Sequence, residues 1–94
     1  MEKLINALAI TFDLRVEKIK GRKRYSRKVS HAKMFFCLFA YNEYRIRHCD
    51  IAHFLECPRT NVYHLLLSAQ NNMKHDEEFR RRYEELRIGI DLMS

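Results

Sequence analysis

Residues that form turns are scarce in this sequence: it contains two glycines, Gly21 and Gly89, and one proline, Pro58, among 94 residues. Domains built only of β-strands need many more turn residues, so this scarcity favours a mostly helical fold. Long apolar runs are also lacking, since the longest, residues 34–41, is far shorter than the roughly 20 residues that span a bilayer. The sequence therefore predicts a helical domain without a transmembrane segment.

Paired cysteines are lacking as well. Cys37, Cys49 and Cys57 are odd in number and have no C-x-x-C spacing, which is typical of reduced cytoplasmic thiols rather than of a disulfide framework. The N-terminus has no small-residue cleavage site of a secretory signal, so we do not expect export. With 47% hydrophobic and 32% charged residues, residues 1–94 suffice for one globular domain with a single core.

Outside one segment the sequence has no excess of positive charge. Residues 15–33, the basic block, contain nine Lys/Arg and one acid, Glu17, whereas the remainder contains nine basic and eleven acidic residues. The net charge of +6 therefore originates in this block. A charge concentrated in this way produces a directional field that suits an anionic partner, above all DNA.

The spacing of apolar residues predicts a series of helices. A first amphipathic helix covers about residues 2–11, and Asp13 is expected to cap a short helical turn after it. Residues 31–41 are apolar on nearly every side, which indicates a helix at the centre of a bundle. Asp76 is expected to cap a final helix, of which residues 88–94 fray or dock weakly. The central helix is predicted to bury four aromatic residues: Phe35, Phe36, Phe39 and Tyr41.

Residues 48–74 have the pattern of a short helix, a tight turn and a longer helix. Pro58 disfavours helical geometry in the residue before it and is tolerated in the first turn of a helix, so we expect the second helix over residues 59–74. This order is that of a helix-turn-helix, whose second helix enters the major groove. Many helical bundles contain such a pair, and it is the preceding basic block that indicates DNA.

The side chains expected to contact double-stranded DNA lie in two places. Arg59, Thr60 and Asn61 begin the second helix, where Arg can bond a guanine, Asn an adenine, and the Thr methyl can touch a thymine methyl. Residues 21–28 are predicted to form a basic loop that follows the DNA backbone or enters the minor groove. The candidate contacts in this loop are Arg22, Lys23, Arg24, Ser26, Arg27 and Lys28.

Four short motifs, spread over about residues 12–86, resemble the C-terminal DNA-binding domain of the bacterial replication initiator DnaA. The family's motifs are R-S-R-x-x-x-x-P-R-Q, I-G-x-x-F, T-T-V-x-H and D-P-E-I-x-x-x-Y-x-x-L. The matching residues are Ser26, Arg27, Lys28 and Val29 for the first, Ile51, Ala52 and Leu55 for the second, Thr60, Asn61, Val62, Tyr63 and His64 for the third, and Asp76, Phe79, Tyr83 and Leu86 for the fourth.

The resemblance implies an all-α, Trp-repressor-like bundle with an initiator-like or regulatory role, in a bacterial nucleoid or a phage-infected bacterial cell. It adds Arg47 and His64 as candidate phosphate contacts. The family's Arg, Asp and His before T-T-V are replaced here by Cys57, Pro58 and Arg59, so the docking mode is implied but the target sequence is not. The family's ATPase motif, GxxxxGK[ST], does not occur in this sequence.

Other interpretations stay open. The basic segment could serve a general accessory that binds RNA or single strands, or the basic face could dock an acidic protein. Thr60 and Asn61 could merely cap the second helix. Cys49, His53 and Cys57 recur at intervals of four like zinc ligands, but structural zinc sites more often use paired C-x-x-C knuckles. The sequence has no evident nucleophile–base set or acidic metal cluster, so we expect no enzyme, metal, cofactor or small-molecule substrate, and the oligomeric state is open.

Overall fold

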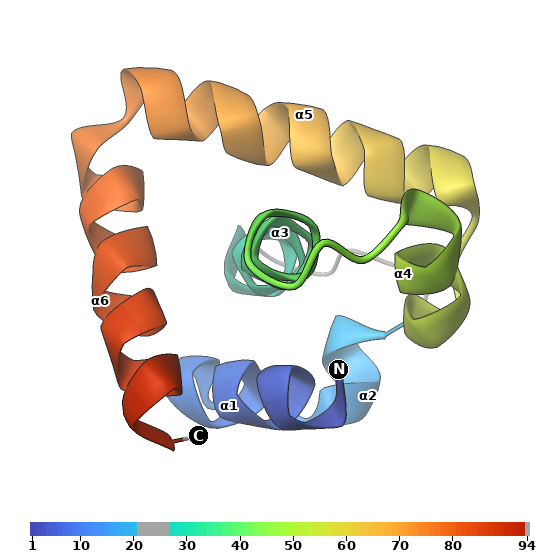
Figure 1. Ribbon diagram of the computed structural model, residues 1–94, viewed down its shortest axis with the longest axis horizontal. Coiled ribbons are helices and arrows are strands. Elements are labelled where there is room, and N and C mark those ends of the chain that lie inside the picture. Colours follow the sequence, from blue (N-terminus) through green and yellow to red (C-terminus); the bar gives the residue numbers. More distant parts are fainter. Residues whose placement is uncertain (21–26, 94) are drawn as a thin grey trace.

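The computed structural model describes residues 1–20 and 27–93. In this part of the chain, six α-helices and no β-strand occur (Figure 1), which confirms the prediction of an all-α domain. The helices are α1 (Glu2–Phe12), α2 (Val16–Ile19), α3 (Arg27–Asn42), α4 (His48–Leu55), α5 (Arg59–His75) and α6 (Glu77–Met93). None of the described helices combines the length and the apolar character needed to cross a bilayer.

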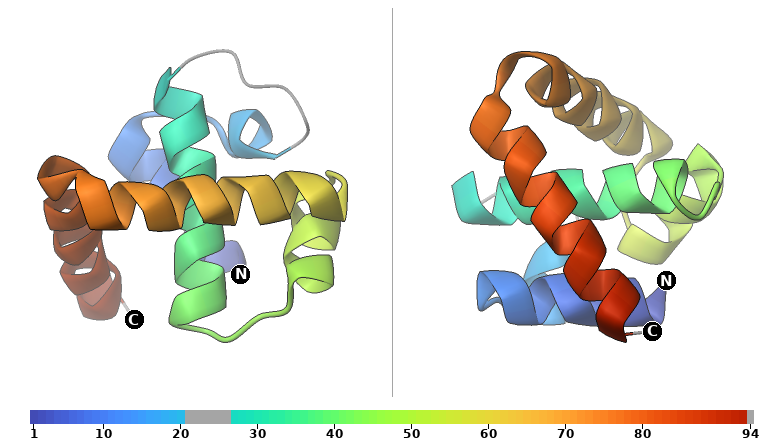
Figure 2. Two further views of the ribbon diagram at one scale, coloured as in Figure 1. Left: turned by 90° about the horizontal axis from the view of Figure 1, so that it is seen from above. Right: turned by 60° about the vertical axis from the view of Figure 1, so that its left-hand side comes forward.

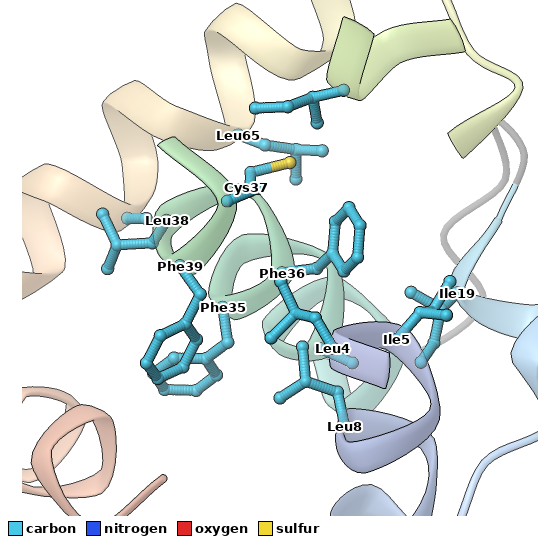
Figure 3. Packing of buried hydrophobic residues seen from close by; sticks show 14 of the residues in the cluster. Leu4, Ile5, Leu8, Ile19, Phe35, Phe36, Cys37, Leu38, Phe39 and Leu65 are labelled. Carbon is cyan, nitrogen blue, oxygen red and sulfur yellow. The ribbon is translucent and has the colours of Figure 1, made fainter. Parts of the chain in front are cut away.

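Helix α3 lies at the centre of the molecule, and the other helices surround it (Figure 1). The six consecutive residues from Phe35 to Ala40 are all buried, because α3 has a neighbour on every side. Phe36 and Cys37 are completely buried among residues of α1, α2 and α5, including Leu4, Ile19 and Leu65 (Figure 3). The prediction of a central helix is therefore confirmed.

Helix α6 is attached to α3 through stacked aromatic rings. Phe79 lies parallel to Phe35, with 4.4 Å between ring centroids, and Tyr83 lies parallel to Phe39 at 4.6 Å. The predicted cap of this helix is also present, since Oδ1 of Asp76 accepts hydrogen bonds from the backbone N–H groups of residues 78 and 79, both at 3.1 Å. Residues 77–93 thus form one continuous helix, so the fraying expected from residue 88 is not present up to residue 93. The alternative expectation of weak docking is not contradicted, since Ile88 is 57% exposed and Ile90 is only partly buried.

The start of the molecule differs from the prediction at Asp13. This residue adopts the left-handed conformation, with φ 53°, and its N–H donates to the carbonyls of Ala9 and Ile10. It therefore ends α1, whereas α2 begins after Arg15 without a side-chain cap. Short polar side chains tolerate the left-handed region better than most residues, and this local preference outweighed the predicted capping of α2.

The central helix begins four residues earlier than predicted. Because Val29 is buried at 3% exposure, the first turn of α3 is packed against the core and the helix starts at Arg27. Arg27 and Lys28 are consequently helical rather than part of the basic loop. The remainder of that predicted loop, residues 21–26, lies outside the described residues.

Tyr41, predicted to be a core residue, is 42% exposed. It lies in the last turn of α3, beyond the buried run, and its ring is 5.0 Å from the ring of His48. Lys33 differs in the opposite sense: although it belongs to the basic block, it is only 2% exposed, and its Nζ donates a 2.7 Å hydrogen bond to the carbonyl of Ile19. One cation of the block therefore joins α3 to α2 instead of contributing to the surface.

Candidate nucleic-acid interface

Helices α4 and α5 are joined by a tight turn at residues 56–58. Glu56 is left-handed, with φ 58°, and its N–H donates to the carbonyls of Ala52 and His53, which ends α4. Pro58, with φ −63° and ψ 149°, is extended and directly precedes α5. Figure 2 shows that α4 lies beside the amino end of α5, while α5 crosses the central helix. The inward faces of the two helices hold this arrangement through Ile51, Ala52, Leu55, Val62, Leu65, Leu66 and Ala69.

The amino ends of α4 and α5 flank one open hollow of about 390 Å³. Arg47 directly precedes α4 and Arg59 is the first residue of α5, yet both line this hollow. Two candidate contacts that are twelve positions apart in the sequence are thus brought together. The hollow is also lined by Tyr41, His48 and Cys49.

The two arginines of the hollow differ in their partners. Nε of Arg47 donates to Oδ2 of Asp50 at 3.2 Å, and both side chains are more than half exposed. This hydrogen bond and the carboxylate charge raise the pKa of Arg47, so its guanidinium stays protonated. In the described part of the chain, Arg59 has no carboxylate partner. Arg59 is therefore the cation of the pair that an incoming anion meets without competition.

The first two turns of α5 present polar side chains to solvent. Arg59, Thr60 and His64 are exposed and Asn61 is half-buried. The N-cap residue of α5 is Pro58, and no side chain donates or accepts a capping hydrogen bond there. The interpretation of Thr60 and Asn61 as mere capping residues is therefore wrong, and both side chains are left for other contacts.

Arg27 and Lys28 lie elsewhere. Both are exposed at the start of α3 and line a groove that also includes Asp13 and Asp76. Asp76 directly follows α5, whereas Arg59 begins it, and 16 steps along a helix amount to about 24 Å. Arg27 and Lys28 are thus grouped with the carboxyl end of α5 and not with its amino end. The candidates Arg22, Lys23, Arg24 and Ser26 lie outside the described residues.

A further cation of the basic block reaches the turn between α4 and α5. Nζ of Lys20 lies 3.8 Å from Oε2 of Glu56 and 4.5 Å from the ring centroid of Phe54. Lys20 is the residue just before the undescribed part of the block. The pattern of charges in the sequence gave no reason to pair Lys20 with Glu56, because 36 residues separate them.

The sequence did not predict that the rings of Tyr41, His48 and Tyr63 lie at this end of the molecule. The ring of His48 lies 5.0 Å from that of Tyr41 and 6.5 Å from that of Tyr63, which is in turn 5.9 Å from His64. Tyr63 is 51% exposed. Helical spacing could have identified Tyr63 as a candidate, because it is one turn after Arg59 and therefore lies on the same side of α5.

The zinc interpretation gains no support from the geometry. Within residues 1–20 and 27–93, no three His, Cys, Asp or Glu side chains come together in a way that could hold a metal ion. Cys49 and His53 are exposed and Cys57 is half-buried in the turn.

Comparison with known proteins finds no family model, no curated protein and no solved structure that matches the chain. The resemblance to the DnaA domain therefore stays a prediction from the motif residues.

Proposed function

We propose that the protein binds double-stranded DNA, with α4 and α5 acting as a helix-turn-helix. In this proposal the first two turns of α5 enter the major groove and present Arg59, Thr60 and Asn61 to base edges. Arg47 and His64 contact phosphates on either side. The protein is proposed to act as a binder rather than an enzyme.

The observation that supports this proposal most strongly is the convergence of Arg47 and Arg59 on one hollow between two helix amino ends. The backbone N–H groups of a helix amino end and its positive dipole favour an anion, and the guanidinium groups can bond a phosphate or a guanine with two parallel hydrogen bonds. The outer face of α5 also exposes polar side chains in its first two turns, such as Thr60 and His64, which suits groove recognition.

The biological role proposed is that of an initiator-like or regulatory DNA binder, in a bacterial or phage-infected cell. This part of the proposal depends on the motif resemblance to the DnaA domain alone. Of the replaced residues, Arg59 begins the proposed recognition helix, and Cys57 and Pro58 lie in the turn directly before it. We therefore expect a target sequence that differs from that family's.

The experiment that tests the proposal is selection of bound duplexes from a random pool, followed by affinity measurements on the selected site. The wild-type chain should select a defined sequence. If about five phosphates are neutralised, the logarithm of its affinity should fall with the logarithm of salt concentration at a slope of about −4 to −5. Tighter binding to single strands than to the duplex would contradict the proposal and favour a single-strand or RNA accessory.

Matched variants test the placement of α5. Arg59→Ala and Asn61→Ala should each weaken binding to the selected site by about 1–3 kcal/mol and spare binding to random duplexes. Arg80→Ala and Asn71→Ala remove the same residue types from exposed positions on α6 and in the later turns of α5. If these controls cost as much as the first pair, the amino end of α5 does not recognise bases.

A further inference from the structure

Tyr63 is an aromatic residue that contributes little to the core. Its side chain is 51% exposed, whereas Val62, directly before it, and Leu65, two residues after it, are buried. Leu67, one turn later, is similarly exposed at 47%, so the outer side of α5 is not uniformly polar. An exposed aromatic ring next to cations is a feature of binding surfaces, because it offers a large contact area at a small cost in conformational entropy.

Neighbouring rings hold Tyr63 in place. Its ring meets His48 edge-on at 6.5 Å and His64 edge-on at 5.9 Å, and His48 packs against Tyr41 at 5.0 Å. The ring of Tyr63 thus contacts His48 of α4 and the adjacent His64 of α5, and α3 supports it only indirectly, through the contact between Tyr41 and His48. A side chain held in this way loses little freedom when a ligand contacts it.

The position of Tyr63 along α5 determines what it can touch. It is four residues after Arg59 and next to His64, so its ring continues the side of α5 that begins at the hollow. In the major groove, the apolar feature that bases offer is the C5-methyl group of thymine, and aromatic side chains make apolar contact with it. Hydrogen-bonding edges of other bases would leave the ring face without a matching partner.

We propose that Tyr63 is a specificity-determining residue that recognises thymine through its methyl group, with His48 packed against its ring and Tyr41 packed against His48. This inference rests on the proposed function, because it requires the amino end of α5 to lie in the major groove. Thr60 is already expected to touch one thymine methyl, so Tyr63 adds a second thymine contact to the guanine, adenine and thymine preferences expected from Arg59, Asn61 and Thr60.

The test replaces each thymine of the selected site, one at a time, by deoxyuridine, which lacks only the methyl group. One such replacement should lower the affinity of the wild-type chain about fourfold, because burial of one methyl or methylene group usually changes an equilibrium constant by about that factor. The same replacement should leave the affinity of Tyr63→Ala unchanged. Tyr63→Phe keeps the ring and should retain the full sensitivity of the wild type.

Tyr44→Ala is the matched control. Tyr44 is exposed to a similar extent, 49%, but lines a groove with residues of α1 and α6 instead of the hollow. This variant should respond to deoxyuridine as the wild type does. The denaturation midpoint of each variant shows whether it is folded.

The outcomes separate the two proposals. If the wild type selects no sequence, the proposed function fails and the inference fails with it. If the wild type selects a site but deoxyuridine at every thymine costs Tyr63→Ala as much as it costs the wild type, or if the selected site contains no thymine, only the inference about Tyr63 is overturned. A thymine at which both proteins lose affinity equally is the one assigned to Thr60.

Discussion

Replacement of Asp50 by Asn should strengthen DNA binding while it weakens the fold. The carboxylate of Asp50 occupies Nε of Arg47 at 3.2 Å and adds a negative charge to the proposed DNA-facing end. In the wild type the guanidinium of Arg47 is shared between Asp50 and the proposed phosphate, and removal of the carboxylate charge strengthens its contact with the phosphate. The upper limit of the gain is one full phosphate contact, which steepens the salt slope by about 0.9 and is worth about eightfold in affinity at about 100 mM salt relative to 1 M.

The effect of the same change on stability has the opposite sign. Asp50 is the acidic residue in the first turn of α4, where a negative charge interacts favourably with the helix dipole. Its removal should lower the free energy of unfolding by about 0.3–1 kcal/mol. The exposed ion pair with Arg47 adds little, because solvent screens it. A variant that is less stable and yet binds more tightly is not explained by general damage to the fold.

Fluorescence anisotropy with a labelled duplex, measured from about 50 to about 200 mM salt, gives the affinity and the slope. Urea denaturation gives the stability. Glu85→Gln removes an exposed acid from α6, on the opposite side of α3 from α4 (Figure 1), and serves as the control. An equal gain from Glu85→Gln would mean that only net charge matters. No gain from Asp50→Asn would refute the placement of Arg47 at the DNA.

Three other changes are expected to act on the fold. Phe79→Ala removes the ring stacked on Phe35 and should lower the free energy of unfolding by about 3–5 kcal/mol. Amide exchange should then be faster in α6 than in α3. A loss below about 1 kcal/mol in urea denaturation would contradict the attachment of α6 to α3 through this stack. Glu56→Gly relieves the left-handed conformation at φ 58° and should raise the free energy of unfolding by about 0.5–1 kcal/mol in the same assay. This value is net of the lost 3.8 Å ion pair between the exposed Glu56 carboxylate and the half-buried Lys20. Burial, followed by the positive charges of Arg27 and Arg82, lowers the pKa of His31 from its ordinary value of 6.5, so its contribution to stability is present above about pH 6.5 and is lost as the pH falls through the lowered value. His31→Gln should flatten the stability profile between about pH 8 and pH 5, and an unchanged profile would show that other groups cause the dependence.

The periodic segments were predictable because one local cause determined each of them. The apolar run of α3 could be accommodated only at the centre of a bundle, and Pro58 set the start of α5 at Arg59, where the structure has it. The cap at Asp76 followed from the preference of a short acidic side chain for the position before a helix. In each case the residue and its consequence are close together in the sequence.

The remaining features depend on contacts between distant segments. Lys33 looks like any other cation of the basic block, and only the packing of α2 against α3 buries its amine at the carbonyl of Ile19. Tyr41 continues an apolar run, and its exposure follows from where that run passes beyond its neighbours. The separation of Arg27 from Arg59 likewise follows from the crossing of α3 and α5, which apolar spacing cannot reveal.

The distance between the two ends of the central helix sets the length of duplex that could contact both of them under the proposed function. Arg27 and Lys28 are at the amino end of α3 and Tyr41 is near its carboxyl end, and the 14 steps from Arg27 to Tyr41 separate these two parts of the surface by about 21 Å. At about 3.4 Å per base pair, that distance corresponds to about six base pairs. A short hairpin stem of four base pairs could reach one of these ends but not both, so truncation of the duplex should remove the contribution of one end in a single step.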